Sequence, residues 1–146
     1  MIRHRRPTRS PALAAVALLL AAAPALAATR LGTPAGETLV GTHKADHITG
    51  AGGPDTLAGG PGNDAPTGGG DDLLSGGTGA DNINVRFGDS PVDGGSDTVK
   101  AGPGRDIVQA DGGVRNAIDC GKGRDRVEYD RNLDKLTHCE KKISRP

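Results

Sequence analysis

Aromatic side chains are almost missing from this sequence. Its 146 residues include no tryptophan, one tyrosine and one phenylalanine, whereas glycine occurs 24 times. Aromatic residues supply much of the apolar area of an ordinary core, and each glycine adds to the entropy lost on folding. The composition excludes an aromatic-rich core and indicates that something else, such as bound metal, holds the chain together. Intrinsic disorder is the alternative that such a composition suggests.

A basic patch with interleaved aromatic residues, as expected of a nucleic-acid-binding protein, is also missing. Acidic and basic residues are equal in number, 18 of each. However, four arginines lie within the first nine residues, so the remainder of the chain carries an excess of acidic residues. We therefore expect no nucleic-acid partner.

The N-terminal 27 residues have the pattern of a secretory signal peptide. They combine an arginine-rich start, an apolar run over residues 12–23 and the sequence Ala25-Leu26-Ala27, which predicts cleavage after Ala27. The apolar run is too short for a membrane span, so we expect a secreted chain of residues 28–146 without membrane insertion. An uncleaved anchor is the alternative.

Residues 76–84 read GGTGADNIN and fit the template Gly-Gly-x-Gly-x-Asp-x-aliphatic-x at every position. Gly76, Gly77 and Gly79 tolerate positive φ and allow backbone carbonyls to crowd one centre in a turn. Asp81 closes that turn, and the next three residues predict a short strand with Ile83 pointing inward. Glycine carbonyls and a carboxylate are the hard oxygen ligands that Ca²⁺ prefers.

A nine-residue phase continues on both sides and spans residues 32–137, with an irregular turn expected at residues 85–91. Residues 59–67 repeat the turn with Gly59, Gly60 and Gly62, but Pro66 stands where an aliphatic residue belongs, which predicts a poor strand. The acidic position is filled by Glu37, Asp46, Asp55, Asp64, Asp72, Asp81, Asp97, Asp106, Asp125 and Asp134, and by Asn116 in one repeat.

This pattern resembles the hemolysin-type, or RTX, calcium-binding repeat. The resemblance implies an all-β fold, a right-handed parallel β-roll with two nonamers per coil, in which repeats i and i+2 stack and Ca²⁺ lies between their turns. The repeats would occupy about residues 32–128. The carboxylate ligands so implied are Asp46, Asp55, Asp64, Asp72, Asp81, Asp97, Asp106 and Asp125, and the turn glycines are Gly59, Gly60, Gly62, Gly76, Gly77 and Gly79.

Stacking at i and i+2 would bring acidic residues together in pairs. Asp46 would face Asp64, Asp64 would face Asp81, and, if residues 85–91 count as one turn, Asp81 would face Asp97. Two such charges at 4 Å repel by about 1 kcal/mol even in water, and a divalent cation would reverse that sign. Folding and calcium binding are therefore expected to be one event. Alternatively, each aspartate only accepts hydrogen bonds within its glycine turn.

Cys120 and Cys139, the only two cysteines, are 19 residues apart, which is one residue more than an 18-residue coil of such a roll. In an exported chain this offset predicts a disulfide between neighbouring coils, and a free thiol pair is the alternative. The C-terminal sequence also resembles the ends of secreted RTX-like proteins. We therefore expect a stapled cap over about residues 120–146, in which the glycine-free repeat around Asp134 binds no metal.

These patterns favour a secreted, non-catalytic calcium-binding module. The repeats leave little room for an enzyme, and neither an HExxH nor a GxSxG motif is present. The alternative is an adhesive or matrix-associated extracellular protein in which calcium is purely structural.

Overall fold

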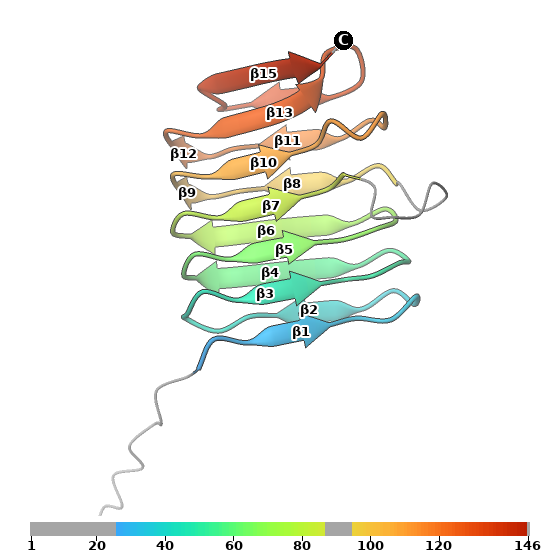
Figure 1. Ribbon diagram of the computed structural model, residues 1–146, viewed down its shortest axis with the longest axis vertical. Helices are drawn as coiled ribbons and strands as arrows, with labels where there is room; N and C mark the ends of the chain where they lie inside the picture. The colour runs from blue at the N-terminus through green and yellow to red at the C-terminus, as the bar shows by residue number, and fades with distance from the viewer. Residues whose placement is uncertain (1–25, 87–94, 146) are drawn as a thin grey trace, which may run out of the picture.

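The computed structural model describes residues 26–86 and 95–145, and every regular element within them is a β-strand (Figure 1). One sheet contains, in spatial order, β1 (Thr29–Leu31), β3 (His47–Thr49), β5 (Ala65–Thr67), β7 (Asn82–Asn84), β10 (Ile107–Gln109), β13 (Arg126–Asp130) and β15 (Lys141–Arg145). A second sheet contains β14 (Lys135–Thr137), β11 (Ala117–Asp119), β8 (Thr98–Lys100), β6 (Leu73–Thr78), β4 (Thr56–Pro61) and β2 (Thr38–Val40). The short strands β9 (Pro103–Gly104) and β12 (Lys122–Gly123) form a third.

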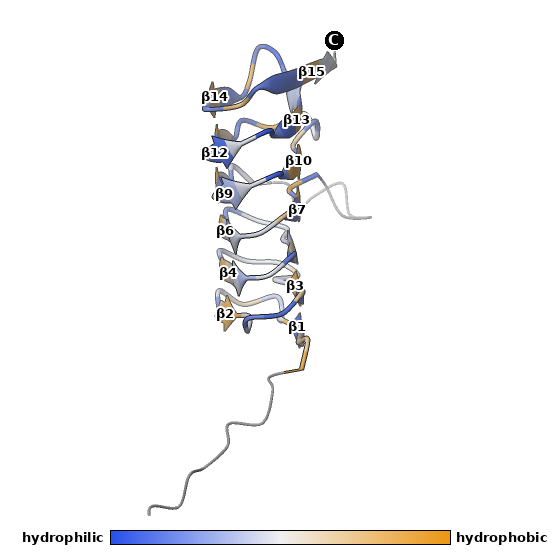
Figure 2. Cartoon of the chain, turned by 90° about the vertical axis from the view of Figure 1, so that its left-hand side faces the viewer, coloured by the Kyte–Doolittle hydropathy of each residue, from blue (hydrophilic) through white to orange (hydrophobic). Residues whose placement is uncertain are grey.

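The chain winds as a parallel β-solenoid. Successive strands of the N-terminal half alternate between the two large sheets, and each strand pairs in parallel with the strand one coil away. His47 of β3, for example, pairs with Ala65 of β5, and Thr56 of β4 pairs with Leu73 of β6. Figure 2 shows the two sheets facing each other along the long axis. The predicted parallel roll with two nonamers per coil is confirmed.

The core is a file of small and medium-sized side chains that both sheets contribute. Besides the mid-strand residues, it includes residues just after strands, namely Val85, Ala101, Ala110, Cys120 and Cys139. Because side chains alternate along a strand, the middle residue of most three-residue strands points inward while its neighbours face out. The inward residues with at most 2% exposure are Ile48, Leu57, Leu74, Ile83, Val99, Val108, Ile118 and Val127. Leu39 and Leu136, in the outermost strands of the second sheet, are only partly buried. The space between the sheets is thus filled by small and medium-sized side chains, so the fold does not need an aromatic-rich core.

Pro66 occupies the inward position of β5 and is buried there. It aligns with Ile48 of β3, so the strand predicted to be poor does form. The pairing of β5 with β7, however, is restricted to Thr67 and Asn84. Proline has no N–H to donate to a neighbouring strand, which explains why this side of the ladder is short.

The glycine turns stack directly on one another. The turn glycines Gly60, Gly62, Gly77 and Gly79 all have positive φ, as predicted. Their columns continue through Gly102 and Gly104 to Gly121 and Gly123. At Gly79, whose φ is +139°, a Cβ atom would lie 1.6 Å from the carbonyl oxygen of Gly62 on the neighbouring coil. Only glycine permits this approach of one backbone to the next.

We expect Gly79→Ala to destabilise the fold by about 3–5 kcal/mol, because it combines a strained φ with a backbone clash. Gly113 is the matched control: its φ is +82°, but a Cβ atom there would meet nothing within 4 Å. Gly113→Ala should therefore cost only the strain of the φ angle, about 1–2 kcal/mol. Urea unfolding at saturating calcium measures both. Equal losses of stability in the two variants would show that close stacking of the turns contributes nothing to stability.

The interruption after β7 changes the predicted stacking. β8, the next described strand, pairs with β6, and β10 pairs with β7. Asp97 therefore lies one coil beyond Asp72, and Asp106 lies one coil beyond Asp81. The predicted pair Asp81–Asp97 is wrong, because the segment between β7 and β8 connects consecutive strands on opposite sheets and does not take the place of a repeat.

A disulfide links Cys120 and Cys139 across neighbouring coils near the C-terminus, as predicted. Their Cα atoms are 5.1 Å apart, and both residues are buried in the core file. Beyond it, β15 pairs with β13 over five residues and extends the first sheet by one strand. The expected cap thus consists of β14, β15 and the crosslink.

Some predictions fall outside the described residues. They include most of the expected signal peptide at residues 1–27 and most of the irregular turn at residues 85–91. Among the described residues, no helix is long and apolar enough to cross a membrane.

Candidate metal centre

Two columns of polar side chains run along opposite edges of the solenoid, where the chain turns from one large sheet to the other. The first column consists of the residues immediately before β3, β5, β7, β10 and β13, namely Asp46, Asp64, Asp81, Asp106 and Asp125. The second consists of the residues before β2, β4, β6, β8, β11 and β14, namely Glu37, Asp55, Asp72, Asp97, Asn116 and Asp134. All the aspartates of the first column, and Asp55, Asp72 and Asp97 of the second, are at most 4% exposed.

Each column is a ladder of hydrogen bonds between coils. The backbone N–H of one member donates to the side-chain Oδ1 of the member one coil further on. The N···O distance is 2.8 Å from Asp46 to Asp64 and from Asp64 to Asp81. The same bond joins Asp55 to Asp72, Asp72 to Asp97, Asp81 to Asp106 and Asp106 to Asp125. Asn116 takes the same role by accepting the N–H of Asp97 at 3.0 Å.

The second carboxylate oxygen of most members has no hydrogen-bond partner in the structure. These buried Oδ2 atoms belong to Asp55, Asp64, Asp72, Asp81, Asp106 and Asp125. A buried polar atom without a partner costs about 1–3 kcal/mol, and more when the group is charged. These unpartnered oxygens recur along both columns. Their recurrence indicates that a ligand from outside the chain satisfies them.

Asp46 and Asp134 differ from these six residues. The Oδ1 and Oδ2 atoms of Asp46 accept the backbone N–H groups of Ala28 and Thr42, respectively. The two oxygens of Asp134 accept those of Asn116 and Asp130, each at 2.8 Å. The metal-ligand role of Asp46 stays a prediction, but its carboxylate is already satisfied, as is that of Asp134.

Glycine makes room for the unpartnered oxygens of the N-terminal coils, whereas Ala101 and Cys120 hold the equivalent positions before Asp106 and Asp125. A Cβ atom on Gly59 would lie 2.5 Å from Oδ2 of Asp64, and one on Gly76 would lie 2.4 Å from Oδ2 of Asp81. Neither glycine has positive φ. Their role is therefore to leave space beside the carboxylate, which differs from the turn-forming role predicted for them.

Burial raises the pKa of the column aspartates. The pKa of Asp97 rises to about 7 and those of Asp72 and Asp106 to about 6. Repulsion from the neighbouring carboxylates adds to the effect of burial, and the backbone N–H bonds oppose it. At Asp46, by contrast, the hydrogen bonds from Ala28 and Thr42 outweigh burial and lower the pKa.

In excess chelator, the folded fraction of the chain should rise as the pH falls from about 8 to about 5. A raised pKa means that the native state binds more protons than the unfolded chain, whose aspartates titrate near pH 3.9. The corresponding stability is present at low pH and is lost as the pH rises through about 6 to 7, the native pKa values of Asp72, Asp106 and Asp97. Circular dichroism at constant ionic strength measures the change. Asp97→Asn should make the folded fraction depend less on pH. A folded fraction that falls toward pH 5 would contradict the prediction.

The donor set fits a hard cation. Within residues 26–86 and 95–145, no three His, Cys, Asp or Glu side chains gather into a self-contained metal cluster. A cation in these columns would instead be held by stacked carboxylates, turn carbonyls and water, which are oxygen donors suited to Ca²⁺. The unpartnered Oδ2 atoms and the space beside Gly59 and Gly76 agree with such a ligand.

Sequence reasoning missed two features of the carboxylate columns and their surroundings. Glu140 accepts the N–H of Asp125 and so continues the first column, but no glycine turn precedes it. Arg86 forms ion pairs with Asp111 and Glu128 and thereby ties three coils together. Arg86 lies where the nine-residue phase breaks, so periodicity could not place it.

These features define a class of protein, a parallel β-solenoid with glycine turns and columns of buried carboxylates suited to a hard cation. The family described as the RTX calcium-binding nonapeptide repeat matches residues 31–65, 67–89 and 92–114, and the chain belongs to this family. Neither the curated proteins nor the solved structures gave a match. The carboxylate columns extend beyond the matched residues, to Asp125 and Asp134.

Proposed function

We propose that this protein is an exported, non-catalytic structural module whose carboxylate columns bind several Ca²⁺ ions, and that binding drives folding. The observation that carries the proposal is the set of six buried Oδ2 atoms without a hydrogen-bond partner. Hydrogen bonding between coils uses Oδ1 and leaves Oδ2 for a cation. Membership of a calcium-binding repeat family supports the choice of ion.

Calcium, when bound, would supply positive charge between carboxylates that otherwise repel one another. Residues of the chain set the register of the coils, keep space open for the cation and exclude water. Oδ1 of each aspartate fixes the register of adjacent coils, and Gly59 and Gly76 keep space open beside Oδ2 of Asp64 and Asp81. The aliphatic file excludes water from the interior. Binding and folding are coupled because the columns exist only when the coils are stacked.

Equilibrium dialysis with Ca²⁺ tests the proposal. We expect several ions per chain, with affinities in the range of about 10⁻⁴ to 10⁻³ M that is typical of extracellular calcium modules. Mg²⁺ at the same concentration is the control and should bind weakly, because it requires a near-ideal octahedron and dehydrates reluctantly. Absence of calcium binding up to about 10 mM, well above that range, would overturn the proposal.

Export is the second part of the proposal. It is supported by the signal-like N-terminus and by the Cys120–Cys139 disulfide, which suits an oxidising compartment. The test is the intact mass of the protein recovered outside the producing cells. We expect a chain that begins at Ala28 and contains no free thiol. A full-length chain retained in the cytoplasm would contradict export without affecting the calcium proposal.

A further inference from the structure

An open cavity of about 800 Å³ lies where β10, β13 and β15 begin. The basic residues that line it are exposed, and they are Arg105, Arg124, Arg126 and Lys141. Asp106 and Asp125 also line it, but they are at most 1% exposed, and their Oδ1 atoms accept backbone N–H groups between coils. Glu140 is the one exposed carboxylate of the lining. A ligand would therefore meet four positive groups and one negative group.

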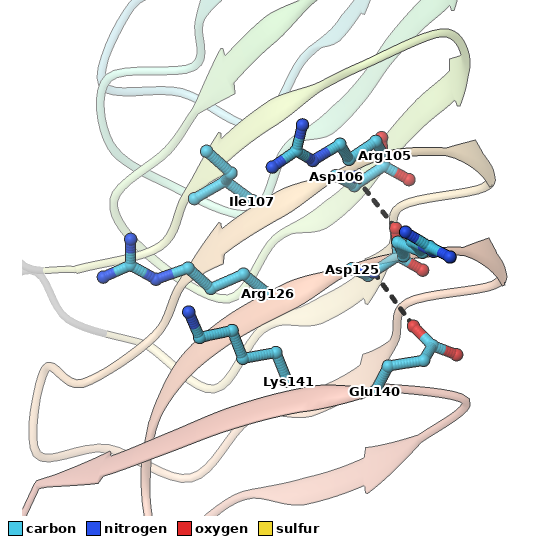
Figure 3. Close-up of a pocket in the computed structure, with 8 residues that line it drawn as sticks. Arg105, Asp106, Ile107, Asp125, Arg126, Glu140 and Lys141 are labelled. Atoms are coloured by element: carbon cyan, nitrogen blue, oxygen red, sulfur yellow. Dashed lines mark hydrogen bonds between the residues drawn. The ribbon is translucent and has the colours of Figure 1, made fainter.

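Strand register brings these cations together. Arg126 of β13 pairs with Ile107 of β10 and with Lys141 of β15, so the three residues lie on one face of the first sheet, with about 4.8 Å between neighbouring strands. Arg105 and Arg124 occupy equivalent positions on adjacent coils, each directly before a column aspartate. Figure 3 shows Arg126 and Lys141 extending on one side of the close-up and Glu140 on the other. The four cations thus form a cluster at the start of neighbouring strands.

The repeat itself does not require these cations. In the N-terminal coils, the residues directly before and after the first-column aspartates include no lysine or arginine, and they are Ala45, Asn63, Ala80, His47, Ala65 and Asn82. Those coils bury the same kind of carboxylate, since their first-column aspartates are at most 3% exposed. Arg105, Arg124 and Lys141 also form no salt bridge with any described residue. Their charges are therefore available to a ligand.

The other groups of the lining narrow the chemistry of that ligand. Guanidinium groups bind carboxylates through two parallel hydrogen bonds. Glu140 can accept hydroxyl groups, and Ile107, which is 38% exposed, offers an apolar contact for the C–H groups of a sugar ring. Among the described residues, none that lines the cavity is aromatic and could stack on nucleic-acid bases. A polymer with both carboxylates and hydroxyl groups fits this lining better than one with a negative charge on every unit, which Glu140 would repel.

We propose that the cation cluster formed by Arg105, Arg124, Arg126 and Lys141 binds the carboxylates of a uronate-bearing polysaccharide. The inference goes beyond calcium binding, because the groups that bind the polymer are exposed cations. Export, as proposed above, would give this surface access to polymers outside the cell. Because the cations are exposed, binding should weaken as the salt concentration rises.

A fluorescently labelled oligosaccharide of hyaluronate, in which a uronate alternates with a neutral sugar, tests the proposal by anisotropy at saturating calcium. We expect the unmodified protein to bind it, and unlabelled dextran, which is uncharged, not to compete. Arg105→Gln combined with Arg124→Gln should weaken binding about tenfold, as expected for the loss of two exposed charge pairs. This double variant should keep the fold, because Asn63 and Ala80 hold the same position in other coils, and circular dichroism checks that it does.

Lys100→Gln combined with Lys135→Gln is the matched control, because it removes the same charge from exposed residues of the second sheet. It should leave binding nearly unchanged. Equal losses in the two double variants would show that only net charge matters and would overturn the inference. Hyaluronate that binds no better than dextran would overturn it too, as would tighter binding of double-stranded DNA than of hyaluronate at the same salt concentration.

The inference and the proposed function fail separately. Calcium binding by the variant with both Arg105→Gln and Arg124→Gln, measured by equilibrium dialysis, should match that of the unmodified protein, because an arginine side chain has no acceptor oxygen. A variant that loses calcium together with hyaluronate would show that the arginines support the carboxylate column, which would overturn the inference. If the unmodified protein folds without binding calcium, the proposed function fails, and anisotropy still tests the cation cluster.

Discussion

In excess EDTA, residues 28–146 should give the circular dichroism spectrum of a largely unfolded chain, and calcium should restore the β-sheet signal. Without a cation, carboxylates on successive coils repel one another, by about 1 kcal/mol per contact at 4 Å even in water. Their buried Oδ2 atoms also lack partners. The core that opposes this repulsion consists only of small and medium-sized side chains. We expect the transition at a calcium concentration of about 10⁻⁴ to 10⁻³ M.

The control for this result is titration with Mg²⁺ at the same ionic strength, which separates specific binding from screening of charge. Screening alone would act at high salt with any cation. A β-sheet spectrum that is identical in excess chelator and in calcium would disprove the coupling of folding to calcium. Such a result would favour the alternative in which the aspartates serve only as hydrogen-bond acceptors, although the structure places these bonds between coils and not within single turns.

Asp64→Asn and Asp81→Asn should each raise the calcium concentration needed for folding by about tenfold. Asp134→Asn can accept only one of the two backbone N–H groups that Asp134 accepts, so it should cost about 1 kcal/mol of stability even at saturating calcium without weakening calcium binding. Asn116 already shows that asparagine fits the ladder, since its Oδ1 accepts the N–H of Asp97. At Asp64 and Asp81 the substitution therefore keeps the bond between coils and removes only the charge. At Asp64 and Asp81 the charge belongs to a carboxylate with an unpartnered Oδ2, whereas both oxygens of Asp134 accept backbone N–H groups.

Calcium titrations followed by circular dichroism measure the three midpoints. Alanine at the same positions is a harsher comparison, because it also breaks the bond between coils. Each alanine variant should therefore lose stability even at saturating calcium. If Asp134→Asn proves as damaging as Asp64→Asn and Asp81→Asn, the cation column runs through the C-terminal cap and its assignment as a metal-free segment is wrong.

The sequence by itself determined the local structure of each repeat. Nine-residue spacing of Gly, Asp and an aliphatic residue places one turn, one carboxylate and one inward side chain in each repeat, and these local features need no information from distant parts of the chain. For the same reason the inward positions of Ile48, Leu57 and Ile83 could be read directly. The partnership of Cys120 and Cys139 followed from their separation once two repeats per coil were assumed.

The tertiary structure decided which coil stacks on which, and how each carboxylate is used. The pairs Asp72–Asp97 and Asp81–Asp106 depend on how the chain returns after β7, and local periodicity carries no signal across that break. Likewise, Glu140 enters the first column only because β15 pairs with β13. Asp64 and Asp134 occupy equivalent sequence positions, yet only Asp64 has a free Oδ2. Hydrogen-bond partners one coil away are distant in sequence and become neighbours only when the coils stack.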